Sequence, residues 1–223
     1  MKRIGIFGLG QFGMTLLENM ADQHVELLAV DVDLDKVESV KDLVTRAVCL
    51  TNVSEDTMAS AGTGDLEVAV VTIGEDFAAS VLTTAILKRL HVPRIIARAS
   101  SDMHEQVLRA VGATEIVRPE KEVSMQLAAR LLIPGLQTFL SLDTKHRIIE
   151  VTAPKDLVGK TLMESDFRNR YRLNIIAIRR GTMGPDGRLL ETINEMPAGA
   201  DRIEAGDILI LLGTDKATSA FMG

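Results

Sequence analysis

The sequence predicts an α/β fold in which a Rossmann-type, doubly wound parallel sheet of six strands is followed by a crossover helix and a small α+β domain. Three observations indicate this fold. Short apolar runs alternate with helical patterns from the first residue onward, which is typical of βαβ units. The run 68–71 is apolar without alternation, as expected when helices cover both faces of a sheet. From Lys145 onward the elements become short and β-rich, so a second, smaller domain is expected there.

Each element of the first domain follows from its local pattern. In the first helix Phe12, Leu16 and Met20 recur at the i, i+4 and i+8 positions of one face. The fourth helix is expected to cover the sheet with six apolar residues, Ala78, Val81, Leu82, Ala85, Ile86 and Leu87. The predicted strands are Arg3–Phe7, Leu27–Asp31, Arg46–Leu50, Val68–Thr72, Arg94–Arg98 and Glu115–Val117. The predicted helices are Gln11–His24, Asp33–Leu43, Ser54–Ala61, Asp76–His91 and Asp102–Val111.

A crossover helix is predicted to begin with Pro119 at an N1-like position and to continue over Glu120–Ile133. Pro134-Gly135 ends it. The next segment, Leu136–Leu142, is too apolar for a solvated linker and too short to bury itself, so we expect it to pack on another chain. A single chain would expose much of this apolar surface, which predicts an obligate oligomer. The apolar stripe of the helix consists of Val123, Leu127, Leu131 and Leu132.

We divide the chain into residues 1–134, the sheet with its crossover helix, and residues 135–223, a linker and the small α+β domain. Within the second part, Pro185-Asp186-Gly187 lies in the segment Gly181–Gly187 and predicts a hairpin turn. The other predicted elements are a strand at Arg147–Val151, a helix at Thr161–Tyr171, strands at Ile175–Arg179, Arg188–Ile193 and Asp207–Leu212, and a final turn of helix.

Composition and charge exclude several classes of function. No stretch approaches the roughly 18 consecutive apolar residues that span a bilayer. The first residues run directly into a strand rather than a signal peptide, so we expect a cytoplasmic protein. The formal net charge of −6 disfavours binding to nucleic acid. The single cysteine, Cys49, cannot form a disulfide or a thiolate metal site within one chain.

The segment Gly8-Leu9-Gly10-Gln11-Phe12-Gly13 follows the first strand and opens the first helix, which is the context of a dinucleotide-binding turn. Gly8 permits the tight turn, Gly10 lets the backbone approach a pyrophosphate, and Gly13 lets the helix pack on the strand. Free N–H groups at the helix N-terminus favour the phosphates. A glycine turn without a ligand is the alternative, and the strand–turn–helix context disfavours it.

Asp31 ends the second strand, where its carboxylate can accept hydrogen bonds from ribose hydroxyls. Its charge would repel a 2′-phosphate, and no Arg or Lys follows at positions 32–35, so NADP is disfavoured against NAD, ATP or ADP. Val32 follows directly and is included among the candidate site residues. Asp33 either binds the ribose as a second ligand or caps the next helix, and capping preferences favour the cap.

Further candidates lie at the carboxyl edge of the sheet, where a doubly wound fold places its ligand. Thr51 and Asn52 follow the third strand, and the Asn52 amide either reads the adenine edge or prepares the next helix. Ile73 and Gly74 follow the fourth strand and are included with them. Arg98 ends the fifth strand, where it either neutralises phosphate or forms a surface salt bridge.

The sequence lacks a catalytic constellation. A hydride-transferring dehydrogenase needs an acid or base in a cleft that faces the nicotinamide, and the four histidines are scattered. None of them forms a pair with metal-ligand spacing, and no HxxxH, CxxC, GxSxG or P-loop pattern occurs. We therefore predict that the protein is not an enzyme. A small NAD-dependent oxidoreductase or an NAD-sensing regulator is the alternative.

The chain resembles the RCK (regulator of K⁺ conductance) family, in particular the cytosolic nucleotide-binding subunits of bacterial Ktr and Trk potassium uptake systems. The resemblance rests on the stretch 4–13, on Ala29-Val30-Asp31 and on Arg118-Pro119-Glu120-Lys121, and it covers nearly the whole chain. It implies a regulatory subunit whose homodimers form octameric rings under a membrane-embedded potassium-translocating partner. Such a protein is peripheral to the inner face of the membrane. Exchange of ATP and ADP, or binding of NAD(H), would change the shape of the ring.

The resemblance also implies roles for single residues. The position of Arg98 is a basic phosphate ligand, and the position of Glu120 helps to hold a cation such as Mg²⁺ near the phosphates. The dipole of the helix that Glu120 opens explains a carboxylate there equally well. The family commonly has arginine where this chain has Gln11, and the loss of that charge leaves the preference among ATP, ADP and NAD(H) open.

A second ligand site is implied in the C-terminal domain, where the segment Phe167–Ile176 carries three arginines within five residues. In some family members this half binds cyclic di-AMP in a dimer groove. Arg168 and Asn174 match groove positions, and Ile175 is included with them; an anionic dinucleotide suits an arginine. The alternative is a solvated, arginine-rich helix face, which a run of charges more commonly forms.

Overall fold

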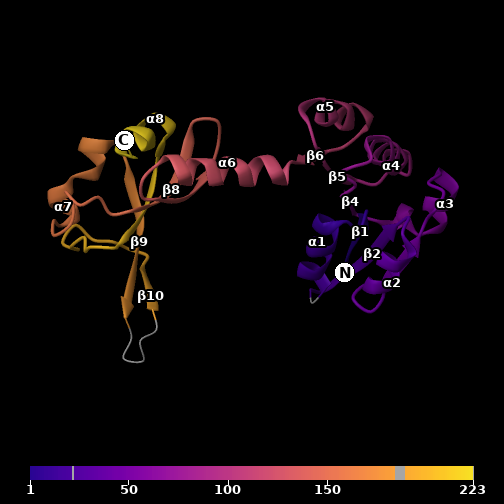
Figure 1. The fold of residues 1–223 in the computed structure, drawn as a ribbon, viewed down its shortest axis with the longest axis horizontal. Helices are drawn as coiled ribbons and strands as arrows, with labels where there is room; N and C mark the ends of the chain where they lie inside the picture. Colours follow the sequence, from indigo (N-terminus) through magenta and orange to yellow (C-terminus); the bar gives the residue numbers. More distant parts are fainter. Residues whose placement is uncertain (22, 184–188, 223) are drawn as a thin grey trace. The chain divides into compact units, whose positions relative to one another are not determined.

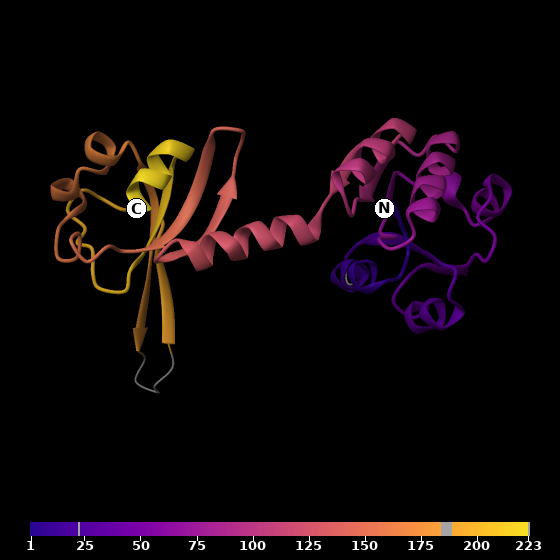
Figure 2. The ribbon, with the colours of Figure 1, turned by 45° about the horizontal axis from the view of Figure 1, so that its top comes forward.

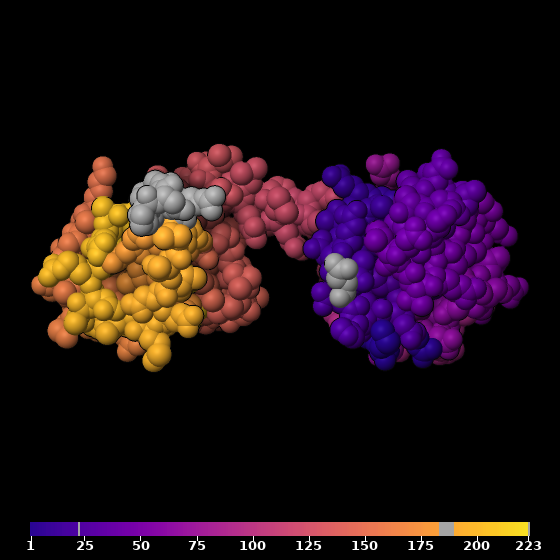
Figure 3. All heavy atoms as spheres, turned by 90° about the horizontal axis from the view of Figure 1, so that it is seen from below, coloured from indigo at the N-terminus to yellow at the C-terminus, as the bar shows by residue number. Residues whose placement is uncertain are grey.

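The computed structural model describes residues 1–21, 23–183 and 189–222. They form two compact units, Met1–Lys121 and Glu122–Gly223, and each unit has a hydrophobic core of its own. Figure 1 shows the course of the chain in both units, and Figure 3 shows each unit as a closely packed body. The boundary between the units falls after Lys121, whereas the predicted domains divide after residue 134.

The first unit contains a sheet of six parallel strands in the order β3-β2-β1-β4-β5-β6. This is the strand order of a Rossmann fold, so the predicted fold class is confirmed. The strands are β1 (Lys2–Phe7), β2 (Val25–Asp31), β3 (Arg46–Cys49), β4 (Val68–Val71), β5 (Arg94–Arg98) and β6 (Glu115–Val117). All six agree with the predicted strands to within two residues at either end.

Helices cover both faces of this sheet (Figures 1 and 2). On one face Ile6 and Ala29 belong to a buried cluster with Leu17 of the first helix. On the other face Phe7 and Val30 belong to a cluster that includes residues of the fourth and fifth helices. Burial on both faces explains why the strands are apolar without alternation. The helices are α1 (Gln11–Ala21), α2 (Leu34–Val40), α3 (Glu55–Ser60), α4 (Phe77–Arg89) and α5 (Asp102–Val111).

The buried face of α4 differs from the predicted one. Ser80, Thr83 and Thr84 are buried, whereas Ala78 is exposed and the side chain of Leu82 is 49% exposed. The hydroxyl of Thr84 donates to the carbonyl oxygen of Ser80 at 2.8 Å, so the helix satisfies this buried polar group internally. The prediction ranked residues by hydrophobicity alone and therefore placed Ala78 and Leu82 on the wrong side.

The crossover helix is α6 (Pro119–Leu132), and none of its residues is buried. The side chains of Leu131 and Leu132 are 77% and 80% exposed, and Val123 and Leu127 are exposed as well. Ala129 packs against the core of the second unit, as does Ile133 just past the end of the helix. Among the described residues, no helix is long and apolar enough to cross a bilayer.

The second unit contains an antiparallel sheet in the order β10-β9-β11-β8-β7. Its edge strand β7 (Leu136–Ser141) shows that this segment finds a place within its own chain, which was not expected, and packing on another chain stays a prediction. The backbone of β7 pairs with β8 of the same chain and Leu136 is buried, so a short strand at a sheet edge suffices to place this segment. Leu140 and Leu142 remain exposed. The other strands are β8 (His146–Thr152), β9 (Asn174–Met183), β10 (Leu189–Asn194) and β11 (Ile208–Thr214).

The predicted helix Thr161–Tyr171 is interrupted in the structure. It consists of α7 (Leu162–Ser165) and a π-helical turn (Phe167–Tyr171), separated by Asp166 with φ +48°. A left-handed residue cannot continue a right-handed helix, and hydrophobic periodicity does not reveal it. The chain ends in α8 (Asp215–Met222), as predicted. The predicted hairpin turn at Pro185-Asp186-Gly187 lies outside the described residues.

Candidate functional site

The glycine-rich loop between β1 and α1 has the geometry expected of its three glycines. Gly8 has φ +104°, and a Cβ there would lie 2.9 Å from Cγ1 of Ile73. A Cβ on Gly13 would lie 2.1 Å from the carbonyl oxygen of Gly8, so only glycine fits at this contact. No heavy atom of the described residues lies within 4 Å of a Cβ built on Gly10. The loop is therefore tight at both ends and open at Gly10, where a phosphate group can approach the backbone.

The residues between these glycines point in different directions. Leu9 is buried in the cluster formed with α1 and α2, and Phe12 is half-buried. Gln11 is exposed at the first position of α1, where free N–H groups favour an anion. Gln11 therefore offers an uncharged hydrogen-bonding group at the position where the resemblance suggests an arginine.

Thr72 holds the glycine-rich loop from the neighbouring strand. Its hydroxyl lies 3.0 Å from the carbonyl oxygen of Phe7 and 2.5 Å from that of Gly8. The sequence analysis missed this residue, because the contact follows from the pairing of β1 with β4 and not from any local pattern. A threonine at the end of a predicted apolar strand was the only available signal.

Asp31 links the glycine-rich loop to the end of β2. Its side chain is buried, and its two carboxylate oxygens accept hydrogen bonds from Leu9 N at 2.5 Å and Asp33 N at 2.9 Å. Each oxygen retains a lone pair with which it can accept a ribose hydroxyl. Asp33 caps α2 by accepting from Asp35 N at 3.0 Å, in agreement with the favoured alternative. Val32, between the two aspartates, is exposed.

Thr51 and Asn52 lie just after β3 and are both exposed. The carbonyl oxygen of Asn52 accepts from the hydroxyl of Thr57 at 2.8 Å, and Ser54 caps α3 through a reciprocal bond with Thr57. These contacts fix the backbone of the loop that carries the Asn52 amide. Reading of adenine by that amide stays a prediction.

Arg98 ends β5, and its guanidinium lies directly on the backbone of Gly74. A Cβ on Gly74 would lie 1.8 Å from Nη1 of Arg98. Nη2 of Arg98 donates to Oε1 of Glu120, which lies in the first turn of α6. The two side chains are 21% and 61% exposed, so the pair is partly sheltered from solvent. The hydrogen bond from Arg98 lowers the pKa of Glu120 below its usual value.

The strand order explains why these residues share one edge. In a parallel sheet all carboxyl ends lie on the same side, and β1 and β4 are neighbours at which the order of the chain reverses (Figure 1). Ligands of doubly wound folds bind at this switch point. The glycine-rich loop, Asp31, Gly74, Arg98 and Glu120 all lie at or shortly after the carboxyl ends of strands, so the sequence-predicted residues of the first unit lie along one edge of the sheet.

The second predicted ligand site lies at one end of β9. Arg168 is exposed in the π-helical turn, Asn174 is exposed at the first position of β9, and Ile175 is half-buried against the core. Left-handed residues flank the turn, with φ +48° at Asp166 and +56° at Arg172. Non-glycine residues in this region cost energy, and such strain concentrates at functional sites.

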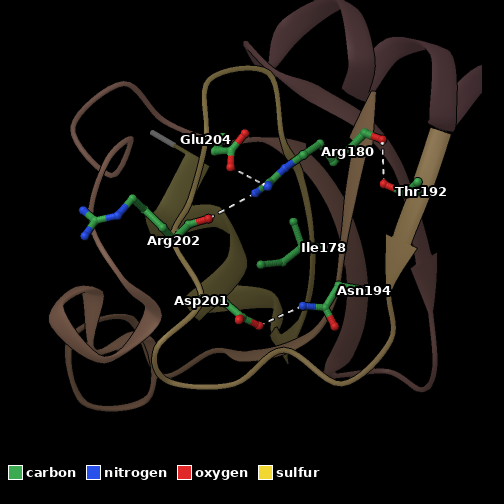
Figure 4. Close-up of a pocket in the computed structure, with 7 residues that line it drawn as sticks. All are labelled: Ile178, Arg180, Thr192, Asn194, Asp201, Arg202 and Glu204. Atoms are coloured by element: carbon green, nitrogen blue, oxygen red, sulfur yellow. Dashed lines mark hydrogen bonds and ion pairs between the residues drawn. The ribbon is translucent and has the colours of Figure 1, made fainter. Parts of the chain in front are cut away.

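A cavity of about 200 Å³ in the second unit lies apart from every predicted site residue (Figure 4). Asp207 is fully buried and pairs with Arg180 through bonds of 2.7 and 2.8 Å, while Glu204 accepts from Arg180 at 2.5 Å. The hydrogen bond to Asp207 raises the pKa of Arg180 above its usual value. The guanidinium is thus largely satisfied within the chain, and the network fixes the end of β9 to the loop before β11. The lining residues are Ile178, Arg180, Thr192, Asn194, Asp201, Arg202 and Glu204.

Comparisons with known proteins agree with this architecture. Residues 4–119 match the family model of the TrkA-N domain, which is more than half of the chain, and residues 146–222 match that of the TrkA-C domain. The chain belongs to the TrkA (RCK) family. The resemblance inferred from the sequence is therefore confirmed.

The RCK family contains relatives that match over almost the whole length. Ktr system potassium uptake protein C of Bacillus subtilis (strain 168) is 33% identical over 220 residues, which cover 99% of this chain and 96% of that protein. Ktr system potassium uptake protein A of the same organism is 30% identical and covers 99% and 95%, respectively.

A solved structure of the GsuK RCK domain has a TM-score of 0.66 at 18% identity and covers 99% of this chain. A structure of the GsuK channel bound to NAD has a TM-score of 0.67 at 19% identity and covers all of this chain. At this identity the likeness shows the fold alone. This chain spans 47% and 39% of the length of those two chains.

Proposed function

We propose that this RCK protein is a cytosolic, nucleotide-binding regulatory subunit that gates a membrane-embedded potassium transporter or channel. The observation that carries the proposal is the match of 33% identity along 99% of the chain to a Ktr system potassium uptake protein. The relatives are named as parts of potassium uptake systems, and no enzymatic activity enters their names. The protein would act at the inner face of the membrane through its partner, and it would not be an enzyme.

The nucleotide is proposed to bind at the switch point of the first unit. The open side at Gly10 accepts the phosphates, and Asp31 accepts the ribose hydroxyls. The proposed ligands are ATP or ADP, or alternatively NAD(H), because all of them share adenosine and a pyrophosphate. Gln11 supplies no positive charge toward a terminal phosphate, so a strong preference for ATP over ADP is not expected.

A cation at the phosphates would take Glu120 as a ligand, but one chain does not provide a complete site for it. Among the described residues no group of three or more His, Cys, Asp or Glu side chains could hold a metal ion. Glu120 is itself paired with Arg98. Further oxygen ligands for Mg²⁺ would come from the nucleotide phosphates, from water or from a second copy of the chain.

Regulation is proposed to act through an oligomer built on α6, first a homodimer and then an octameric ring. The helix has no buried residue in a single chain, and its leucines are the kind of apolar surface that marks a partner site. Two shapes of the ring must differ in nucleotide affinity, since a ligand that binds both equally shifts nothing. Cyclic di-AMP bound near Arg168, Asn174 and Ile175 would be a second input.

Thermal unfolding of the wild-type chain with ATP, ADP, NADH and cyclic di-AMP tests the proposal, because a ligand selective for the native state raises the melting temperature. We expect at least one adenine nucleotide to do so. The proposal fails if none of them shifts the transition. It also fails if the purified protein oxidises or reduces a metabolite with NAD at ordinary enzyme rates.

A further inference from the structure

Arg98 lies between the glycine-rich loop and the first turn of α6. Gly8 packs against Ile73, and Gly74 follows Ile73 in the chain. Nη1 of Arg98 occupies the space that a Cβ on Gly74 would need. A chain of direct contacts therefore runs from the loop that would hold the phosphates to the guanidinium.

The other terminal nitrogen of the Arg98 guanidinium contacts a residue of α6. Nη2 donates to Oε1 of Glu120, and Glu120 is the second residue of α6. This helix begins in the first unit and continues into the second, since the first unit ends at Lys121. The Arg98–Glu120 ion pair is thus a side-chain link between the candidate phosphate site and the start of the segment that connects the two units.

The hydrogen bonds of Arg98 are incomplete. A guanidinium carries five N–H donors in a planar fork. Within the described residues Nε is buried and has no hydrogen-bond partner, and the one acceptor is Glu120. A buried donor without a partner is costly, and an oxyanion such as a phosphate would satisfy it. The geometry therefore favours an anionic ligand at Arg98 in addition to, or in place of, the carboxylate of Glu120.

We propose that a nucleotide phosphate and Glu120 compete for the guanidinium of Arg98, so that phosphate binding releases the ion pair at the start of α6. The inference rests on the proposed nucleotide site and assigns its output. Glu120 acts as a latch that holds Arg98 while the site lacks phosphate. By linkage, any state of the protein that strengthens the Arg98–Glu120 pair weakens phosphate binding by the same factor.

The test compares calorimetric affinities of the full-length chain for ADP and for adenosine, which lacks phosphate, in buffer with EDTA so that cations play no part. NADH replaces ADP if only NADH binds. Glu120→Gln removes the competing charge and keeps the shape of the side chain. Arg98→Gln removes the shared group. Glu115→Gln is the matched control, because it breaks the 2.6 Å ion pair with Arg94 at the other end of β5.

We expect Glu120→Gln to bind ADP roughly two- to fivefold more tightly than the wild type, which is the range that partly exposed ion pairs contribute. Its affinity for adenosine should not change. Arg98→Gln should weaken ADP binding. Adding Glu120→Gln to it should have no further effect, because the guanidinium for which Glu120 and the phosphate compete is then gone. The control should match the wild type with both ligands. If the Gln variant does not fold, Glu120→Asp, whose shorter side chain holds Arg98 less well, should shift affinity in the same direction.

A second measurement follows the helix itself. Amide hydrogen exchange over residues 119–124 should become faster when ADP saturates the wild type and should not respond to ADP in Glu120→Gln. The inference is overturned if Glu120→Gln binds ADP equally or more weakly, or if its gain with adenosine is the same as with ADP. Failure of the proposed function would give a different result, because neither the wild type nor any variant would then bind ADP or NADH.

Discussion

Asp31 has one role that the structure shows and one that stays a prediction. It was predicted as the ribose ligand, and the structure shows that its carboxylate also accepts the backbone N–H groups of Leu9 and Asp33. The same side chain therefore positions the glycine-rich loop, whereas its contact with a ribose stays a prediction. Replacement by alanine removes both acceptors at once, whereas asparagine keeps the shape of the side chain and one oxygen acceptor.

Asp31→Asn should weaken the binding of ADP or NADH by about 1.5–3 kcal/mol, because a hydrogen bond to a charged group has about this value. Calorimetry measures the loss. Asp33→Asn is the control on the neighbouring aspartate, which caps α2 and should retain wild-type affinity. Unchanged affinity in Asp31→Asn would remove Asp31 from the ligand site, and a loss in Asp33→Asn would restore Asp33 as a ligand.

His104 is a residue whose role was not predicted. Its ring is fully buried, and its Nδ1 lies 3.3 Å from Ser100 N. The ring also contacts Phe77 in a tilted arrangement, with ring centroids 4.8 Å apart. Burial lowers the pKa of His104 below its usual value. Because Ser100 N–H donates to Nδ1, the neutral imidazole with its proton on Nε2 fits this site.

The stability of the first unit should therefore fall as the pH drops below about 6.5, the value for an unfolded histidine. Above that pH the neutral ring contributes fully, and the contribution is lost as the pH approaches the lowered pKa of the folded state. Chemical denaturation at pH values from 8 to 5 measures the trend. His104→Gln should flatten the decline, whereas His24→Gln, at an exposed residue, should keep it. Equal declines in His104→Gln and the wild type would contradict this assignment.

At the scale of elements, periodicity predicted the regular parts of the fold and missed those that depend on single residues. The six strands of the first sheet were predicted from their short apolar runs, which are continuous in the central strands because helices bury both faces there. The buried face of α4 was not predicted correctly, because the hydroxyl of Thr84 donates within the helix and this polar residue can therefore be buried. The break at Asp166 was not predicted either, since a left-handed residue leaves no periodic signal.

The candidate site shows the same division. The three glycines could be predicted because their roles depend on neighbours in sequence. Thr72, the bond from Leu9 to Asp31, and the seating of Arg98 on Gly74 depend on which strands lie side by side. Local sequence patterns do not reveal which strands are neighbours, so these contacts are seen only in the folded chain.

Helix α6 allows a test of the proposed oligomer. Leu127→Glu places a charge on the exposed apolar stripe and should shift the protein to smaller species, because burial of a leucine contributes roughly 1.5–3 kcal/mol and a buried charge costs more. Light scattering over a range of protein concentrations measures the change. Gln126→Glu, at an exposed polar position of the same helix, should leave the assembly intact. A wild-type chain that scatters as one 24.2 kDa particle at micromolar concentration would contradict the oligomer itself.

At the scale of the whole molecule, the chain contains two compact units with separate cores and separate proposed ligands. A regulator built in this way can receive two signals, because each ligand stabilises the unit to which it binds.

This division predicts two separable responses. ADP at a hundred times its dissociation constant should stabilise the first unit by about 2.7 kcal/mol. Hydrogen exchange should show the protection mainly within residues 1–121, whereas cyclic di-AMP should protect residues near Arg168 and Asn174. Arg168→Gln is expected to abolish the second response and to spare the first. Uniform protection of both units by either ligand would contradict the separation.

The contact between Gly74 and Arg98 has a consequence for how such a regulator could change over time. The guanidinium of Arg98 can keep its position only if residue 74 is glycine, because the methyl group of an alanine there would lie 1.8 Å from Nη1. Alanine there would displace a flexible side chain without straining the backbone, and no charge would be gained or lost. Sequence variation at this one small residue could therefore reset the nucleotide concentration at which the protein responds, while every charged residue of the site stays the same.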